Sequence, residues 1–404
     1  MKYLVIVYDG MADRKIQSLG NKTPMEVAKK PAMDALTQYA LCGTVSNVPA
    51  GMVPESDTAN LAILSYDPKI YSKGRSPLEA VSMGIEMQSD EVAYRCNIVT
   101  ISEDETEYDD KIMIDHSADE ITTEEADVLI KALDAALGDA IRKFYTGISY
   151  RHCLIWKGGD DSYSFARPHD IIGQRIREYL PHGEAGAEFY RLMKASYDIL
   201  NHHPINEARR ARGLRPANSA WFWSPGKKPA LPSFYEKFGL RASVISAVDL
   251  IKGIGLCAGM ESIDVVGATG NVHTNYQGKA EAAIDAFRRG SDLVYIHVEG
   301  PDECGHRAEL DNKILAIEKI DSLILAPVVE YLKSTGEDFH VMCLPDHPTP
   351  IEIRTHSMEP VPFFIYRSEA HVAGVASLNE DTAIAYNNYI SNGTKLMEIF
   401  TKTL

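Results

Sequence analysis

Residues 3–8, Tyr-Leu-Val-Ile-Val-Tyr, form a continuous apolar run that stops at Asp9-Gly10. An apolar run of this length that ends in a polar turn is typical of a strand buried on both faces of a parallel sheet. Asp9 would then lie just beyond the carboxyl end of that strand, where open parallel sheets bind their ligands. The stretch therefore predicts an α/β protein with a functional site at this edge of the sheet.

Three later segments repeat the pattern of an apolar run followed by polar, glycine or proline residues: 264–268, 293–298 and 339–344. Helical patterns at 279–289 and 311–333 lie between them. Strands that alternate with helices predict a parallel sheet flanked by helices.

The middle of the chain, 93–215, differs from the flanking sequence because it is polar and lacks this alternation. It contains a predicted helix over 123–137, whose first residues have the hydroxyls and carboxylates that favour a helix start. It ends in the basic segment 209–212, which we interpret as a solvated helix face. We therefore predict a discontinuous core of residues 1–92 and 216–404 with 93–215 inserted as a second domain.

The bulk composition fits a large soluble enzyme. Of 404 residues, 45% are apolar and 24% charged, and a chain of this length favours two domains. The net charge of -16 and the lack of a long Lys/Arg run argue against a nucleic-acid partner. No leader or long apolar segment is recognisable, which predicts a cytoplasmic protein without a membrane partner. The sequence does not indicate the oligomeric state.

Metal-binding residue types follow several of the predicted strands. Taken singly, each has a simpler explanation as a turn residue, a helix cap or a surface histidine. Together they favour a dinuclear metal site, because Asp-x-x-x-His places two donors one helical turn apart and an adjacent Asp-His can face neighbouring ions. The candidate ligands are Asp9, Asp302, His306, Asp346, His347 and His356.

Ser56 is the candidate nucleophile. It lies in Pro54-Glu55-Ser56-Asp57-Thr58-Ala59-Asn60, directly before the apolar residues 61–64. A serine at a helix start is surrounded by backbone N–H groups that can receive a phosphate. The alternative is a simple N-cap, and only the predicted metal cluster favours the nucleophile.

Six short motifs occur in order from the first strand to residue 357: Asp9-Gly10, 54–61, 66–68, 301–306, 346–350 and 355–357. In this ordered set the chain resembles the archaeal-type cofactor-independent phosphoglycerate mutases, metalloenzymes of the alkaline phosphatase superfamily. The resemblance implies an alkaline-phosphatase-like core with a mostly parallel sheet and a smaller inserted α+β lid domain. The chain departs from the family pattern at Glu55, where members often have glycine.

The resemblance also implies how the metals are held. One divalent ion would bind Asp302, His306 and His356, and a second would bind Asp9, Ser56, Asp346 and His347. Manganese is the ion most associated with the family, and carboxylate plus imidazole donors without thiolate suit it, with zinc and magnesium as competitors. Cys304 lies between ligands and is not one of them.

The implied reaction interconverts 3-phosphoglycerate and 2-phosphoglycerate through a phosphoserine on Ser56, without bisphosphoglycerate. The inserted domain would close over this small phosphorylated metabolite and exclude water. Basic residues would bind the anionic substrate, although a surface or structural role is an equal alternative for each. They are Arg95, Arg151, His152 and His169 in the lid and Lys279, as a catalytic residue, in the core.

Three other functions share these motifs. A homoserine kinase of the same family would keep the metals and Ser56 but would need a nucleotide pocket, and the chain has no Walker-type or Rossmann glycine-rich loop. A metal-dependent phosphatase would admit water to the phosphoserine. A metal-binding scaffold would not need Ser56 at all.

Overall fold

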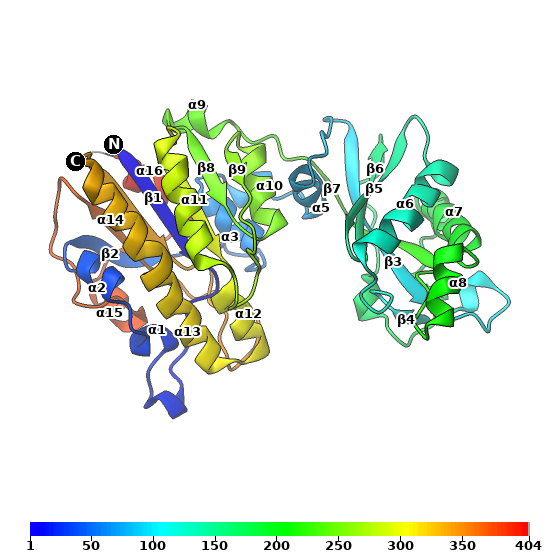
Figure 1. Ribbon diagram of the computed structural model, residues 1–404, viewed down its shortest axis with the longest axis horizontal. Helices are drawn as coiled ribbons and strands as arrows, with labels where there is room; N and C mark the ends of the chain where they lie inside the picture. The colour runs from blue at the N-terminus through cyan, green and yellow to red at the C-terminus, as the bar shows by residue number, and fades with distance from the viewer. Residues whose placement is uncertain (403–404) are drawn as a thin grey trace. The chain divides into compact units, whose positions relative to one another are not determined.

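The computed structural model describes residues 1–402. The chain divides into two compact units: Met1–Ser72 together with the chain from Ala230 onward, and Lys73–Pro229. In Figure 1 the second unit runs in colour from cyan to green. We call them the core unit and the inserted unit.

The inserted unit is longer at both ends than the predicted 93–215. Strand β3 (Glu91–Ile101) pairs antiparallel with β7 (Ser219–Lys227), so residues beyond 215 belong to its sheet. On the other side, α5 (Ser76–Ser82) packs against β3, and the Ser76 hydroxyl donates to the Ser224 carbonyl. Sheet pairing therefore moves both boundaries outward.

An eight-stranded sheet forms the centre of the core unit. Strand β1 lies between β10 and β11 and is parallel to both, as predicted, whereas β12 is antiparallel to its two neighbours. The sheet is therefore mostly parallel. In spatial order its strands are β13 (Tyr389–Ile390), β2 (Ala40–Val45), β12 (Val361–Arg367), β11 (Phe339–Leu344), β1 (Lys2–Tyr8), β10 (Leu293–Val298), β8 (Ala242–Ile245) and β9 (Glu261–Ile263).

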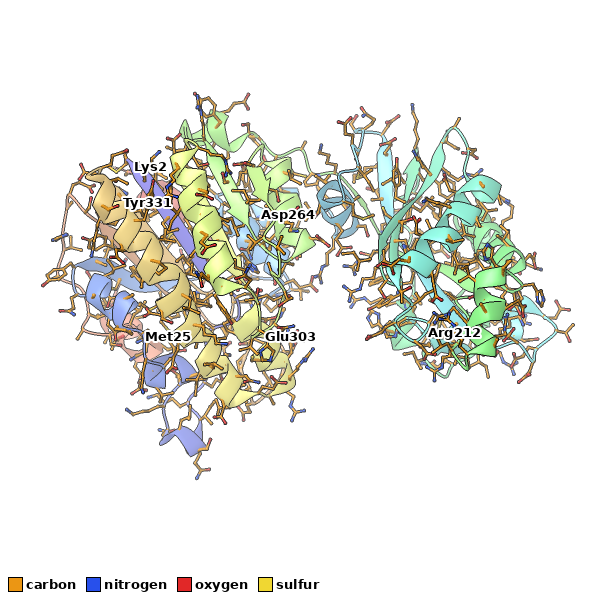
Figure 2. All side chains as sticks on the ribbon, viewed as in Figure 1. Lys2, Met25, Arg212, Asp264, Glu303 and Tyr331 are labelled. Carbon is orange, nitrogen blue, oxygen red and sulfur yellow. The ribbon has the colours of Figure 1, made fainter. Side chains whose placement is uncertain are left out.

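The strand predicted at 264–268 is wrong. The strand in this region, β9, ends at Ile263, and Asp264, labelled in Figure 2, follows it. Val266 is 93% exposed, and the carbonyls of Val266 and Gly267 accept hydrogen bonds from Asn275. The segment is a turn that leads into the next helix, which is why its two valines do not pair with a strand.

Helices cover both faces of the sheet. On one face, Leu4, Ile6 and Tyr8 of β1 belong to an apolar core that includes residues of α11 (Tyr276–Arg288), α13 (Leu310–Ile320) and α14 (Ala326–Thr335). Figure 1 shows α11 and α14 side by side. On the other face, Tyr3 contacts Phe400 with ring centroids 5.6 Å apart. This alternation is the period of two that a strand imposes.

The predicted helix 311–333 is present as α13 and α14, joined by the π-helical turn η5 (Asp321–Leu325). The remaining helices of the core unit are α1 (Pro24–Val27), α2 (Pro31–Thr37), α3 (Ser56–Ile63), α4 (Pro68–Tyr71), α9 (Phe234–Phe238), α10 (Asp249–Cys257), α12 (Gly300–Arg307), α15 (Glu380–Ala385) and α16 (Leu396–Thr401).

The inserted unit is an antiparallel sheet with helices, so the predicted fold class, an α/β core plus a smaller α+β unit, is confirmed. Its helix α6 (Thr123–Leu137) begins where predicted, and the Thr122 side chain accepts a hydrogen bond from the Glu125 N–H at 3.3 Å. The other elements are β4 (Met113–Asp115), β5 (Arg142–Ile148), β6 (Arg151–Lys157), α7 (Gly183–Leu200) and α8 (Pro204–Ala211).

The interpretation of 209–212 as a solvated face is wrong for Arg209. Its side chain is 2% exposed, forms an ion pair with Glu125 and donates to the Ala118 carbonyl at 2.6 Å. Arg212, labelled in Figure 2, is half exposed and contacts the same glutamate. Arg209 therefore ties α8 to the start of α6.

Among residues 1–402, no helix combines the length and the apolarity needed to cross a membrane.

Candidate active site

Five of the six candidate ligands of the core unit meet where β1, β10 and β11 end, and His356 joins them from a loop. Asp9 follows β1, and Asp346 and His347 follow β11. Asp302 and His306 lie on α12, directly after β10; Figure 2 labels their neighbour Glu303. Because the three strands are adjacent and parallel, their carboxyl ends share one edge, as the sequence predicted.

Gly10 allows these segments to approach. Its backbone has φ +62°, and a Cβ there would lie 2.5 Å from Thr349 Oγ1 and 2.7 Å from Asp302 Cα. Its N–H donates to Asp346 Oδ1 at 3.2 Å. A side chain at this position would therefore separate α12 from the end of β1.

The first donor group is Asp302, His306 and His356. The two histidine Nε2 atoms lie 3.0 Å apart, and each is 3.3 Å from a carboxylate oxygen of Asp302. The Nδ1 atoms face carbonyl oxygens, that of Arg354 at 3.0 Å from His306 and that of Pro54 at 2.6 Å from His356. Because a carbonyl can only accept, each Nδ1 carries a proton, so Nε2, which faces Asp302, is the ring nitrogen left to bind a metal ion in place of a proton.

The second group is Ser56, Asp9, Asp346 and His347. Ser56 Oγ lies 3.3 Å from His347 Nε2. The same Nε2 lies 3.6 Å from a carboxylate oxygen of Asp9 and 3.6 Å from one of Asp346. Ser56 is the first residue of α3, so its hydroxyl lies at the positive end of a helix.

Neighbouring side chains hold these donors in place. The Asn60 amide donates to Asp346 Oδ2 at 2.9 Å and to the Ser56 carbonyl at 2.8 Å, and the Tyr295 hydroxyl donates to Asn60 Oδ1. The Thr349 hydroxyl donates to Asp302 Oδ1. Such contacts fix the orientation of metal ligands.

The site has a surplus of buried negative charge. Burial and the neighbouring Asp346 raise the pKa of Asp9 well above its usual range, and burial with nearby Asp302 raises the pKa of Glu299 to about 7. Although burial opposes it, hydrogen bonds from His306 and His356 hold the pKa of Asp302 well below its ordinary value. Across residues 1–402, no lysine or arginine forms an ion pair with Asp9, Asp302 or Asp346.

These residues fit divalent cations. Asp9 Oδ1 is buried without a hydrogen-bond partner, and the carboxylates lack a protein cation. Three groups of residues each offer donor atoms that all lie within 4.8 Å of one another. They are Asp302 with His347 and His356, Asp9 with His297 and Asp346, and Asp9 with Glu299 and Asp302. Carboxylate and imidazole donors without thiolate suit manganese or zinc.

Lys279 lies on α11 and is fully buried, with Nζ 3.2 Å from the His297 carbonyl. Burial lowers the pKa of Lys279 to about 8. The lysine therefore lies behind the end of β10, next to the donor cluster in the fold, and it is not a helix-start lysine on the surface.

In the inserted unit, Arg95 and His169 both contact Trp223. The Arg95 guanidinium lies 4.5 Å from the Trp223 ring centroid and pairs with Glu79, while the His169 ring lies 5.5 Å from the same ring. His116 is 6.0 Å from His169. The structure therefore groups two of the four predicted substrate-binding residues around one indole.

The other two occupy opposite sides of β6. Arg151 is exposed and lies over the Tyr150 ring, whose hydroxyl accepts from it at 3.0 Å. His152 is only 4% exposed, and its Nδ1 accepts a hydrogen bond from the Gly147 N–H at 3.1 Å. Strand alternation turns His152 into the unit, so its contacts are structural.

Known proteins resemble the chain over nearly its whole length. The 2,3-bisphosphoglycerate-independent phosphoglycerate mutase of Methanosarcina barkeri is 48% identical over 370 residues, which cover 91% of each sequence. The chain belongs to the 2,3-bisphosphoglycerate-independent phosphoglycerate mutase family. The resemblance inferred from the motifs is thereby confirmed.

Other comparisons agree with this phosphoglycerate mutase family. The family model described as 2,3-bisphosphoglycerate-independent phosphoglycerate mutase matches residues 37–206. Phosphoglycerate mutase 2 of Methanothermobacter thermautotrophicus is 41% identical over 401 residues, covering 99% of this chain and 97% of its own. The solved cofactor-independent phosphoglycerate mutase of Thermoplasma acidophilum has a TM-score of 0.70 at 26% identity over 99% of both chains. A solved Pyrococcus horikoshii protein has a TM-score of 0.81 at 26% identity, covering 99% and 96%.

For this member of the mutase family, the sequence reasoning missed several residues that line the site. Asn60 and Thr349 lie inside the quoted motifs but were given no role. His297 lies in the strand 293–298, Glu299 directly follows that strand, and both precede the Asp302 motif. One signal could have found His297, because it is the only polar residue in an otherwise apolar or aromatic strand. His116 gives no such signal, because it lies in a polar stretch.

Proposed function

We propose that the chain catalyses the interconversion of 3-phosphoglycerate and 2-phosphoglycerate without bisphosphoglycerate, by way of a phosphoserine on Ser56. The mutase names of relatives at 41% and 48% identity support this activity and do not favour a homoserine kinase. The observation that carries the proposal is the position of Ser56 at the start of α3, 3.3 Å from His347 Nε2 and beside a buried carboxylate cluster.

Two divalent ions are part of the proposal. Asp302, His306 and His356 would hold one ion, and Asp9, Ser56, Asp346 and His347 would hold the other, with manganese as the favoured metal. When bound, such ions supply positive charge that stabilises phosphoryl oxygens and acidifies a nearby hydroxyl.

The protein's own groups orient the nucleophile. Asn60 connects the Ser56 backbone to Asp346, so the hydroxyl and the carboxylate keep a fixed separation. The first N–H groups of a helix lack partners within the helix, so those at the start of α3, where Ser56 lies, can donate hydrogen bonds to a phosphoryl group. Ser56 would attack phosphorus, the glycerate oxygen would leave with a proton, and the other glycerate hydroxyl would later take the phosphoryl group back.

Substrate binding is proposed for several basic residues. We propose that Arg95, Arg151 and His169 bind the carboxylate and hydroxyls of phosphoglycerate, since guanidinium groups bind planar anions with two hydrogen bonds. Lys279 would contribute positive charge from the core unit. His152 is not part of this proposal, because its side chain is buried and its Nδ1 accepts from the Gly147 N–H.

The test is a turnover assay on protein reconstituted with Mn²⁺, using 3-phosphoglycerate as the sole phosphorylated compound and ³¹P NMR to follow 2-phosphoglycerate. We expect turnover in the wild type and a loss of at least about 10³-fold in Ser56→Ala, because the nucleophile is removed. Ser65→Ala is the matched control, because Ser65 lies two residues after α3 ends and its hydroxyl donates to the Thr394 carbonyl.

A parallel reaction with homoserine and ATP distinguishes the kinase. Equal turnover in wild type and Ser56→Ala would contradict the phosphoserine route, and phosphorylation of homoserine without mutase turnover would contradict the substrate. Rapid acid quenching followed by mass spectrometry should find the phosphoryl group on the Ser56 peptide.

A further inference from the structure

His297 is a buried histidine that the proposed reaction does not use. It lies near the carboxyl end of β10 and is 0% exposed. Its Nδ1 is 3.4 Å from the Ser246 hydroxyl, whereas its Nε2 has no hydrogen-bond partner. An unpartnered polar atom in a protein interior is costly, so a buried nitrogen of this kind calls for an explanation.

Two carboxylate oxygens of the site lie near Nε2. Asp9 Oδ2 lies at 3.1 Å and Asp346 Oδ2 at 4.0 Å, and neither contact is a hydrogen bond. Donor atoms around one transition-metal ion, with bonds of about 2.0–2.2 Å, lie roughly 3–4 Å from one another. Both distances from Nε2 are in this range, and donor atoms of Asp9, His297 and Asp346 all lie within 4.8 Å of one another.

The two oxygens of Asp9 face different histidines. Oδ1 is 3.6 Å from His347 Nε2, and Oδ2 is 3.1 Å from His297 Nε2. A carboxylate in this position can bridge two cations, one on each oxygen. The His297 side of Asp9 therefore differs from the side that faces His347, whereas Asp346 Oδ2 lies near both histidines, 3.6 Å from His347 Nε2.

The nearby lysine does not neutralise this side of the cluster. Lys279 donates to the backbone carbonyl of His297 at 3.2 Å and forms no ion pair with Asp9 or Asp346. Two buried carboxylates thus face an imidazole without a fixed positive charge between them, which is the arrangement that a bound cation stabilises.

We propose that His297 Nε2, Asp9 Oδ2 and Asp346 Oδ2 bind a divalent cation of their own, a third position beside the two ions of the proposed function. The donor set of one imidazole and two carboxylates selects Mn²⁺ or Zn²⁺ over Mg²⁺ or Ca²⁺. The inference rests on the proposed function only in sharing Asp9 and Asp346 with it.

The test removes the other histidine ligands and asks whether one ion is still bound. Metal-stripped full-length protein is titrated with Mn²⁺, and free ion is measured by electron paramagnetic resonance. We expect the variant His306→Ala/His347→Ala/His356→Ala to retain about one equivalent, and adding His297→Ala should weaken that binding at least about 10-fold. His371→Ala, added in its place, is the matched control for an accessible histidine outside the site.

A second measurement uses the single variant, in case the multiple variants do not fold. Wild type should bind about three equivalents and His297→Ala about two, with circular dichroism confirming that both are folded. Two equivalents in wild type, or equal binding with and without His297, overturns the proposal. Mutase turnover on the same samples separates the inferences, because three bound ions without turnover would contradict the proposed function alone.

Discussion

Asp9 and Asp13 lie four residues apart in the same loop, are both buried, and have opposite surroundings. Asp13 accepts from Lys313 Nζ at 2.7 Å, and its carboxylate also accepts from the backbone N–H groups of Arg14 and Ile351. Asp9 has histidines and other carboxylates nearby instead of a lysine, and its Oδ1 has no hydrogen-bond partner.

The difference separates structural from functional charge. The Asp13–Lys313 pair has no net charge and is hydrogen-bonded within the protein, so it joins the loop after β1 to α13 without an ion from solution. The Asp9 cluster has several carboxylates and, within the described part of the chain, no lysine or arginine paired with them, so its stability depends on protons or cations from solution. Substitutions and conditions that affect one and spare the other test this contrast.

The largest effect is expected for Asp9→Asn. Mutase turnover should fall on the order of 10³-fold or more, because several kcal/mol of cation-mediated stabilisation are lost. The melting temperature of the metal-free protein should not fall, because burial beside Asp346 raises the pKa of Asp9 and disfavours its charged form, and asparagine removes that charge. Turnover and thermal unfolding, measured on the same preparation, check the expected loss of activity and the expected unchanged stability. A fall in metal-free stability would contradict the contrast.

Lys313→Met should destabilise the protein by about 3–5 kcal/mol, because it leaves the buried Asp13 carboxylate without its cation. Urea denaturation measures the loss of unfolding free energy. The double variant Lys313→Met/Asp13→Asn is the control and should be more stable than Lys313→Met alone. If the single and double variants are equally destabilised, the charge is not the cause.

Chelation of divalent ions should lower the melting temperature of the wild type by roughly 5–10 °C, since an ion at 100 times its dissociation constant contributes about 2.7 kcal/mol. Calorimetry with Mn²⁺ and with a chelator measures the shift. Asp9→Asn should lose most of the shift, whereas Lys313→Met should keep it. A shift that survives in Asp9→Asn would place the ion elsewhere.

The smallest effect concerns His152, a buried group that the inserted unit keeps neutral. Burial lowers the pKa of His152 to about 3 in the folded state, whereas the unfolded value is near 6.5. The unfolded chain therefore binds more protons below pH 6.5, and stability is lost as the pH falls from 6.5 toward 3. His152→Asn, which keeps an acceptor for the Gly147 N–H, should flatten this part of the stability profile. Urea denaturation between pH 7 and 4 measures it, and an unchanged slope would contradict the assignment.

The sequence predicted the centre of the fold well because its signals there are local. Residues 3–8 are uniformly apolar and end at Asp9-Gly10, so both the buried strand and the position of the carboxylate could be read directly. The segment 264–268 has a similar apolar composition and is a turn, because Asn275 takes its backbone hydrogen bonds. Composition cannot show that a side chain and an N–H later in the chain take the hydrogen bonds that a neighbouring strand would otherwise make.

The limits of the inserted unit and the second layer of the site depend on contacts distant in sequence. The pairing of β3 with β7 joins segments more than one hundred residues apart, and the sequence near residue 215 contains no signal that predicts it. Asn60 and Thr349 become important only because Asp346 and Asp302 approach them in the folded chain. The run of charges at 209–212 predicts an exposed Arg209, whereas this side chain is buried because it pairs with Glu125 on another helix.

The hydrogen bond between His356 Nδ1 and the Pro54 carbonyl has a consequence for how the site tolerates change. It connects a candidate metal ligand to the residue two positions before Ser56, so the same backbone segment positions the ligand and the nucleophile. An insertion between residues 50 and 55 would displace that carbonyl and let the imidazole rotate. Such a variant would bind the ion more weakly although Ser56 is still present. The length of this short loop is therefore as constrained as the identity of the ligand and the nucleophile.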